Sequence, residues 1–330
     1  MFGGKGGVGK TTCASSAGLY FARKDLKTLI ICTDPAHSLA DSLEQTVGDG
    51  IKQVKGVDNL SALEVNSEKA LDSFKLQYED EIKNIMETST HLDKEDIESM
   101  FQLQIPGMDE LMGFKTIIDL IEEANYEKYI VDTAPTGHAL RLLNSPYLID
   151  DWIKVMAKMR WKYRFMVQSF AGKYKPDKSD DFLMSLKKTV KRIETILKDG
   201  TQCEFIPVMI PEPMAIQETE RLLKSLNDSG IAVKSLVVNN VMESEGCEFC
   251  RARKKAQQKY MAEVRTKFGH LKIIPVPLQD NPVMGIEVLD RIKKNYGRKF
   301  KTYQRYRGQV YSVISLGTTL KKHRKIKRYF

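Results

Sequence analysis

The sequence predicts an α/β fold: a doubly wound, mainly parallel sheet, interrupted by a helical insertion rich in methionine. The first observation is a series of short, continuously apolar runs, which is typical of parallel strands covered on both faces. The second is that helical stretches separate these runs, as in right-handed βαβ crossovers. The third is a long stretch from about Ser67 to Leu197 in which helical patterns replace this rhythm.

Each element follows from a local pattern. A first helix is expected at Thr12–Arg23. The apolar runs expected to form strands are Lys27–Thr33, Tyr129–Thr133, Cys203–Ile210, Ile231–Asn239 and Leu271–Val276. The helices expected in the insertion are Glu68–Thr88, Lys94–Gln104, Asp109–Ala124, Ile149–Phe170 and Asp180–Leu197, with the strand at Tyr129–Thr133 returning to the sheet between them. The sequence contains no internal repeat.

Length and composition indicate an ordinary globular chain with a basic tail. The 330 residues are 42% hydrophobic and 29% charged, which excludes a disordered chain and fits about two domains. The net charge is +9, but residues 291–330 carry 14 Lys or Arg and no Asp or Glu, so residues 1–290 carry −5. A nucleic-acid-binding protein usually spreads basic charge over its folded body. We therefore do not expect a nucleic-acid partner.

The expected location is the cytoplasm. No apolar run approaches the ~20 residues that cross a bilayer, and no signal peptide opens the chain. The odd number of cysteines indicates reduced thiols. Residues 298–330 mix Lys and Arg with Tyr, which suits either a solvated charged extension or a segment that binds anionic lipid or RNA.

The strongest motif is a phosphate-binding loop, which fits G-x-x-x-x-G-K-[ST] at every position. Its glycines allow backbone N–H groups to surround phosphates, and the following helix points the positive end of its dipole at them. Lys10 is expected to reach the β- and γ-phosphates, and the Thr11 hydroxyl to bind Mg²⁺. The expected nucleotide-binding residues of the loop are Gly4, Lys5, Gly6, Gly7, Val8, Gly9, Lys10, Thr11 and Thr12.

Lys5 is a second lysine near the start of this loop. In the pattern K-G-G-V-G-K-T-T it marks the deviant Walker ATPases of the partition and metal-pump type. In those families such a lysine reaches a nucleotide across a dimer interface. The alternative is a solvated surface lysine.

Two acidic loops follow expected strands. Asp34 follows the strand at Lys27–Thr33, and Asp132 lies at the end of Tyr129–Thr133. Carboxylates at the carboxyl edge of parallel strands lie beside the phosphate loop. Asp34 is therefore the candidate for polarising the attacking water, and Asp132 for the Mg²⁺ shell. Asp41 is a weaker competitor, and a turn or a helix cap is the alternative for each of them.

The insertion holds eight of the 14 methionines, between Met86 and Met184. Methionines at helical spacing usually fill a core. The alternative is a flexible apolar groove, because the unbranched thioether adapts to varied partners. The candidates for lining such a groove are Met100, Met108, Met112, Met156, Met159 and Met166.

Cys247 and Cys250 form a single C-x-x-C pair. Two thiolates supply half of a tetrahedral zinc shell, and a two-fold dimer would supply the other half by symmetry. A lone C-x-x-C is also a redox motif, although no thioredoxin-like strand precedes this one.

Together these motifs resemble those of the arsenite-pump and tail-anchored-protein-targeting ATPases. The matching segments are GKGGVGKTT, TDPAHSLAD and DTAPTGHALRLL, together with Pro211–Leu222 and Val237–Asn239, and the similarity runs from Gly3 to about Leu289. The arsenite-pump subunits usually fuse two copies of this unit and carry metalloid-binding cysteines. This chain has one phosphate loop and no cysteine between Cys32 and Cys203. It therefore looks most like the single-copy targeting branch, and an archaeal source is one interpretation.

The resemblance implies a homodimer that hydrolyses ATP to ADP and phosphate at the subunit interface. It implies that Asp34 positions water, that Lys10 and Lys5 offset phosphate charge, and that Thr11 and Asp132 hold Mg²⁺. It further implies nucleotide contacts by Glu212, Asn239 and Pro277, and a structural Zn²⁺ shared by Cys247 and Cys250 of both subunits. Closing on ATP would align the helical regions into a groove for the transmembrane helix of a tail-anchored client, in a dimer or a client-loaded tetramer that meets a membrane receptor.

The expected organisation has three parts. The ATPase core covers residues 1–66, 127–145 and 200–297, the helical client-binding subdomain covers 67–126 and 146–199, and the basic tail covers 298–330. A phosphate loop normally follows a full strand, yet only Met1 and Phe2 precede Gly3, so we hypothesise a natural start further upstream. Two alternatives remain: the ATPase subunit of an arsenite or antimonite pump, and a partition-type ATPase that binds DNA.

Overall fold

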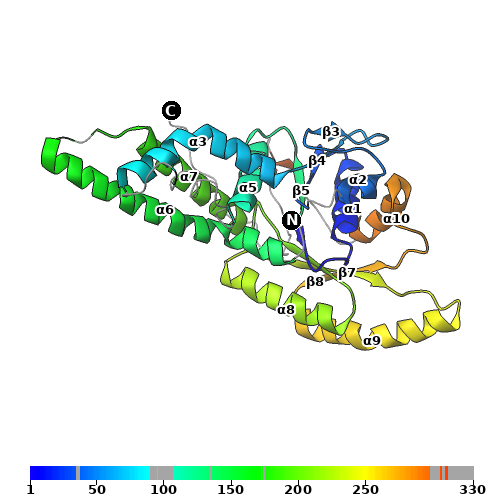
Figure 1. The fold of residues 1–330 in the computed structure, drawn as a ribbon. Coiled ribbons are helices and arrows are strands. Elements are labelled where there is room, and N and C mark those ends of the chain that lie inside the picture. Colours follow the sequence, from blue (N-terminus) through cyan, green and yellow to red (C-terminus); the bar gives the residue numbers. More distant parts are fainter. Residues whose placement is uncertain are drawn as a thin grey trace, which may run out of the picture.

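The computed structural model describes residues 1–34, 38–89, 95, 107–133, 136–171, 173, 175–297, 305–306 and 309–310. Eight of its strands form one sheet in the order β3-β4-β2-β5-β1-β6-β7-β8. Every neighbouring pair in this sheet is parallel except β3 and β4. The predicted doubly wound α/β sheet is confirmed (Figure 1).

The strands of the sheet are β1 Phe2–Gly3, β2 Thr28–Cys32, β3 Lys52–Gln53, β4 Leu60–Glu64, β5 Lys128–Asp132, β6 Ile206–Met209, β7 Ser235–Val241 and β8 Lys272–Pro277. All five strands expected from apolar runs are present, with shifted ends. The sequence analysis missed β3 and β4. At the centre of the sheet β1 is a strand of two residues, and it pairs with both β5 and β6.

The helices are α1 Lys10–Ala22, α2 Ser38–Leu43, α3 Ser67–Ser89, α5 Met108–Glu122, α6 Thr136–Ala171, α7 Lys178–Lys198, α8 Pro213–Asp228, α9 Glu248–Phe268 and α10 Gly285–Gly297. The helix expected at Lys94–Gln104 lies outside the described residues, apart from residue 95. The helix expected to begin at Ile149 in fact begins at Thr136. Of the basic tail, the structure describes only β9 Arg305–Tyr306 and β10 Gln309–Val310.

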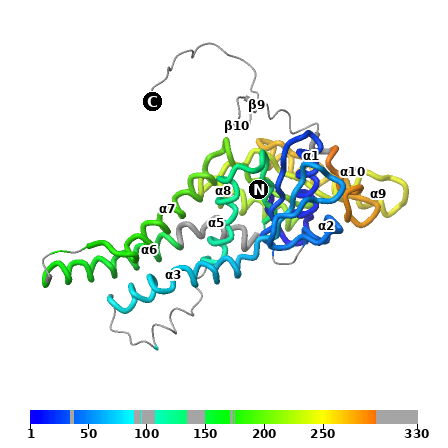
Figure 2. Tube along the Cα trace, turned by 90° about the horizontal axis from the view of Figure 1, so that it is seen from above, coloured from blue at the N-terminus to red at the C-terminus, as the bar shows by residue number. Residues whose placement is uncertain are grey.

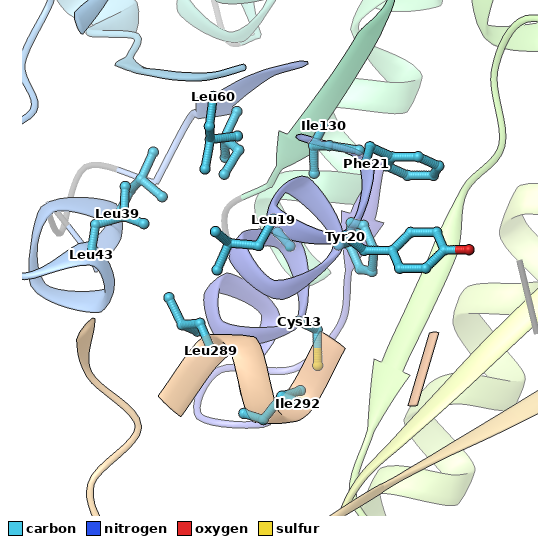
Figure 3. Packing of buried hydrophobic residues seen from close by; sticks show 14 of the residues in the cluster. Cys13, Leu19, Tyr20, Phe21, Leu39, Leu43, Leu60, Ile130, Leu289 and Ile292 are labelled. Atoms are coloured by element: carbon cyan, nitrogen blue, oxygen red, sulfur yellow. The ribbon is translucent and has the colours of Figure 1, made fainter. Parts of the chain in front are cut away.

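Helices cover both faces of the sheet. On one face α1 and α10 pack against Ile30, Ile130 and Ile274, with α2 at the edge of the same cluster (Figure 3). On the other face α5 packs against β2 and β5, while α8 and α9 pack against β6 and β7. Continuous apolar strands are therefore buried on both sides, as parallel strands require.

Helices α3, α5, α6 and α7 form what we call the helical lobe. They share an apolar core, which includes Ile85, Leu111 and Ile193 and extends to Leu222 and Leu226 of α8. Figure 2 shows this lobe at one end of the molecule and helices α1, α2 and α10 at the other. Among the described residues, no helix combines the length and the apolar character needed to cross a bilayer.

Candidate nucleotide site

The phosphate loop connects β1 to α1 and packs tightly against the sheet. A Cβ on Gly4 would lie 2.2 Å from the carbonyl oxygen of Val208, so no larger residue fits there. Gly9 has a left-handed backbone with φ of 86°, and a Cβ on it would lie 2.2 Å from the Asn239 side chain. Since Gly9 has no side chain to cap α1, the N–H groups of the first turn are left for an anion.

Both lysines of the loop are held by groups of this chain. Lys10 is buried, and its Nζ donates a hydrogen bond of 3.3 Å to the carbonyl oxygen of Lys5. The Lys5 Nζ lies 3.2 Å from Oε1 of Glu218 in α8. Lys5, which the sequence analysis expects to reach a nucleotide across a dimer interface, therefore turns its ammonium towards α8 in this structure.

Asp132 lies at the end of β5, directly beside the start of α1. The Thr11 hydroxyl donates a hydrogen bond of 2.6 Å to its Oδ2, and the Ser38 Oγ lies 3.0 Å from the same hydroxyl. Asp132 is 1% exposed, and its Oδ1 has no hydrogen-bond partner in the part of the chain that the structure describes. Burial raises the pKa of the Asp132 carboxyl to about 6, although the Thr11 hydroxyl and the Lys10 ammonium oppose that rise.

This arrangement suits magnesium. Mg²⁺ prefers hard oxygen ligands and is usually bound through one or two carboxylates together with substrate phosphates. A hydroxyl, a buried carboxylate oxygen without a partner and a phosphate-binding loop meet at this point. The residues predicted for the metal are thus brought together, and Asp132 supplies an oxygen that the described protein groups leave without a hydrogen bond.

Asp34 lies beside Asp132 because β2 and β5 are neighbours. Cys32, two residues before Asp34, is in register with Asp132, and the Asp34 charge contributes to raising the pKa of Asp132. Asp34 is half-buried. Residues 35–37, the rest of that loop, lie outside the described residues. Asp41, the weaker competitor, is exposed on α2.

The other predicted nucleotide contacts differ in their placement. Asn239 is buried, and its Nδ2 donates a hydrogen bond of 2.9 Å to the Val8 carbonyl oxygen, so it contacts the phosphate loop directly. Glu212 is exposed at the residue before α8. Pro277 ends β8, and its carbonyl oxygen accepts a hydrogen bond of 2.8 Å from Gln279. Within the described part of the chain, no hydrogen bond joins Glu212 or Pro277 to the loop.

Glu64 and Ser38 are polar residues of this region that the sequence analysis missed. Glu64 ends β4 with its side chain buried, and its Oε1 accepts a hydrogen bond of 3.1 Å from the Ala40 N–H in α2. Ser38 begins α2 and contacts Thr11. Glu64 thus anchors the helix that follows the Asp34 loop. The available signal was a glutamate at the end of a strand, but that strand was itself not predicted.

Comparison with known proteins identifies the family. A family model described as "Anion-transporting ATPase" matches residues 1–296. The chain belongs to the anion-transporting ATPase family.

Curated relatives of this ATPase agree with that result. It is 36% identical over 296 residues to "ATPase ASNA1 homolog 1" of Paramecium tetraurelia, which covers 87% of this chain and 88% of the relative. It is 35% identical over 310 residues to "ATPase GET3C" of Arabidopsis thaliana, covering 88% and 79%. It is 32% identical over 311 residues to "ATPase get3" of Pyrenophora tritici-repentis, covering 90% of each chain.

The C-x-x-C pair of this ATPase lies at the start of α9. Cys247 is exposed, Cys250 is half-exposed, and their sulfur atoms lie 2.8 Å apart as free thiols. Hydrogen bonding between the two thiols lowers the pKa of Cys247 and raises that of Cys250, and the Cys250 N–H at 3.2 Å from the Cys247 sulfur lowers the pKa of Cys247 further. The described residues contain no group of three or more His, Cys, Asp or Glu placed to hold a metal. Two adjacent thiols fit half of a zinc shell.

The methionines predicted for the client groove of this ATPase differ in their placement. Met108, Met112 and Met156 are 2–3% exposed and lie in the core of the helical lobe, so they do not line a surface in this structure. Met159 is partly buried against the same core, whereas Met166 is exposed. Met100 lies outside the described residues. The buried methionines follow the ordinary rule that helical apolar stripes face a core.

Proposed function

We propose that this ATPase is a homodimeric targeting factor that shields the C-terminal transmembrane helix of tail-anchored membrane proteins and delivers them to a membrane. In this role it would work in the cytoplasm and lie at the membrane surface only during delivery. Its partners would be a second copy of the chain, the transmembrane helices of clients and a membrane receptor. The observation that carries the proposal is a set of exposed apolar side chains along α6.

These side chains define the α6 patch: Val155, Trp161, Phe165, Met166 and Phe170. Their exposed fractions range from 48% to 89%. Single exposed apolar residues are normal, but five within one stretch of a helix, including three aromatic rings, indicate a binding surface. The rings of Trp161 and Phe165 stack with their centroids 5.9 Å apart. Such a surface suits an apolar helix as the partner.

The helical lobe is connected to the nucleotide site through two strand ends. Helix α6 begins at Thr136, just after Asp132 ends β5, and α3 begins at Ser67, just after Glu64 ends β4 (Figure 1). A change at either carboxylate on nucleotide binding would thus act directly on a helix of the lobe. The proposed division makes residues 67–126 and 146–199 the client-binding subdomain, residues 1–66, 127–145 and 200–297 the ATPase core, and 298–330 the tail, with α6 running across the boundary at residue 146.

In the proposed reaction, ATP is hydrolysed to ADP and phosphate. Lys10 and, from the partner subunit, Lys5 would offset charge that develops on the phosphates. Thr11 and Asp132 would hold Mg²⁺, which would further neutralise that charge when bound. Asp34 would orient the attacking water. Asn239, Glu212 and Pro277 would contact the nucleotide, and the contact between Asn239 and the loop supports the first of these.

We propose that a structural Zn²⁺ is bound jointly by the two subunits. Cys247 and Cys250 of each copy would supply the four thiolates of a tetrahedral site. Their exposure at the end of a helix supports this, because a shared site must be reachable from a second copy. Replacing both cysteines by serine should remove bound zinc and produce a monomer in native mass spectrometry. A dimer of the serine variant with undiminished stability would contradict the shared site.

The proposal is tested by co-expression with a protein that carries one C-terminal transmembrane helix. A soluble complex that is lost when the client helix is deleted supports targeting. In the ATPase, Phe170→Asp should reduce client recovery, because this side chain is 89% exposed and its change does not disturb the core. Ile51→Asp, at an exposed apolar residue outside the lobe, is the matched control. An ATPase recovered without client, with the client aggregated, would count against targeting.

The second candidate is the ATPase subunit of an arsenite or antimonite efflux pump. The description of the matching family, which names anion transport, favours it. Hydrolysis stimulated several-fold by arsenite, without formation of a client complex, would decide for the pump.

A further inference from the structure

The ion pair between Lys5 and Glu218 joins the phosphate loop to α8. The Lys5 Nζ lies 3.2 Å from the Glu218 Oε1, and the two side chains are 42% and 30% exposed. The other carboxylate oxygen, Oε2, is buried and has no hydrogen-bond partner in the described part of the chain. Both residues line a small cavity between the loop and α8, together with Gly4, Val8 and Thr219. The Glu218 carboxylate is thus fixed directly against the loop.

The backbone and the side chain of Lys5 have different partners. Its carbonyl oxygen accepts the hydrogen bond from Lys10, the lysine at the start of α1, while its side chain extends to α8. An ammonium paired with Glu218 is not available to phosphate oxygens at the same time. A nucleotide that needs the Lys5 charge must therefore compete with Glu218.

We propose that Glu218 is a positioning residue that holds Lys5 against α8 in the conformation described, so that ATP hydrolysis requires this ion pair to open. The inference rests on the proposed function, in which Lys5 contacts the phosphates of a nucleotide bound by a second copy. The strength of the Glu218–Lys5 ion pair thereby controls the fraction of dimers in which Lys5 contacts ATP. It acts only through Lys5 and contacts no reacting atom.

The expected effect is moderate. Ion pairs between partly exposed groups are weak, because water screens them and two long side chains lose freedom. The need to open this pair should lower ATP turnover at limiting ATP by a factor of about two to five. Because salt screens partly exposed charges, the effect should shrink as ionic strength rises.

The first experiment compares two glutamines on α8. Glu218→Gln removes the charge with little change in shape. Glu220→Gln is the matched control, because Glu220 lies on the same helix, loses the same charge and pairs instead with Lys267 at 2.9 Å. ATP turnover of the full chain is measured over a range of ATP concentrations at low salt and at high salt.

Glu218→Gln should raise turnover at limiting ATP by about two- to fivefold at low salt, and the difference should vanish at high salt. Glu220→Gln should match the unmodified chain in both buffers. If Glu218→Gln behaves like Glu220→Gln, the proposal is wrong. If it slows hydrolysis, Glu218 supports Lys5 during the reaction rather than holding it back, and the proposal is equally overturned.

A double-mutant cycle separates this inference from the proposed function. Lys5→Met, Glu218→Gln and the double variant are unfolded in urea, once without nucleotide and once with Mg²⁺ and a non-hydrolysable ATP analogue. The coupling between the two residues should be present without nucleotide and lost with the analogue. Coupling that persists with the analogue refutes the proposal even if turnover rises. Loss of client binding or of dimers would disprove the proposed function and leave the nucleotide-free coupling unchanged.

Discussion

Replacing Asp132 by Asn should have opposite effects on the metal-free chain and on its complex with magnesium and nucleotide. The Asp132 carboxylate is buried, one of its oxygens has no hydrogen-bond partner among the described residues, and burial raises its pKa to about 6. A neutral amide of almost the same shape avoids that desolvation cost. It also removes the charge proposed to hold Mg²⁺. The metal-free chain should become more stable, and the complex weaker.

The magnitude follows from the pKa. Because it is raised from the ordinary 3.8, the folded chain binds this proton more tightly than the unfolded chain does. Between about pH 4 and pH 6 the carboxyl therefore lowers the free energy of unfolding as the pH rises, and the loss is complete above pH 6. The difference between the pKa values of 3.8 and about 6 corresponds to on the order of 3 kcal/mol in the free energy of unfolding, at about 1.4 kcal/mol per pH unit. The attraction to Lys10 is already contained in this pKa, so we expect Asn, which resembles the protonated carboxyl, to give a gain of about 1–3 kcal/mol at pH 7.

The measurement is urea unfolding of EDTA-treated protein from pH 4 to pH 8, with Asp41→Asn as the control at an exposed carboxylate. Because other groups titrate in this range, the quantity compared is the difference between the variant and the unmodified chain. That difference should grow from pH 4 to pH 6 and then stay level. Added Mg²⁺ and ADP should raise the melting temperature of the unmodified chain more than that of Asp132→Asn. A metal-free variant less stable than the parent at pH 7 would refute the reasoning.

Three further predictions concern the site and the lobe. Asn239→Ala leaves a buried loop carbonyl without its donor, so we expect a loss of about 1–3 kcal/mol in urea unfolding and weaker ADP binding by calorimetry. Asp177→Asn keeps the side-chain cap of α7 but removes one of the two carboxylates paired with the buried Arg160, the other being Asp180, so the free energy of unfolding should fall by about 1–2 kcal/mol, whereas the exposed Asp181→Asn should change it by under about 0.5 kcal/mol. Asp34→Asn should still bind ATP but lose turnover and accumulate the closed dimer, and normal hydrolysis by that variant would count against its assigned role.

The continuously apolar strands could be predicted because the sheet buries them on both faces. Strand β4, Leu60–Glu64, has a serine and a glutamate among five residues, so its pattern resembles a loop. It becomes a strand because it pairs with β2 along its whole length. The role of Glu64 follows from that pairing, which brings its carboxylate under an N–H of α2. No local pattern could reveal a contact that depends on a strand set by long-range pairing.

In the helical lobe, too, local sequence patterns could not predict features that depend on tertiary packing. Helix α6 begins at Thr136 and runs through Gly137 and Pro146, two residue types with low intrinsic helix propensity, whereas the sequence predicted a helix only from Ile149. Helical spacing predicted that methionines form an apolar face, but it could not tell whether that face meets the core or a partner. Met112 on α5 lies in the core of the lobe, whereas Met166 on α6 is 48% exposed.

Three interactions of the described site would change when one ligand binds. Among the described residues, one oxygen of the Asp132 carboxylate has no hydrogen-bond partner, the buried Lys10 donates to the Lys5 carbonyl oxygen, and Lys5 is paired with Glu218 outside the loop. A magnesium-bound nucleotide offers a cation to the first and anionic oxygens to both lysines. Part of the binding free energy of the nucleotide would therefore be used to break interactions already present in the chain. The measured affinity should then be weaker than the new contacts alone would give, and the difference would drive the change in structure. Because Asp132 and Glu64 lie just before α6 and α3, that change would first reach the helices that carry the α6 patch.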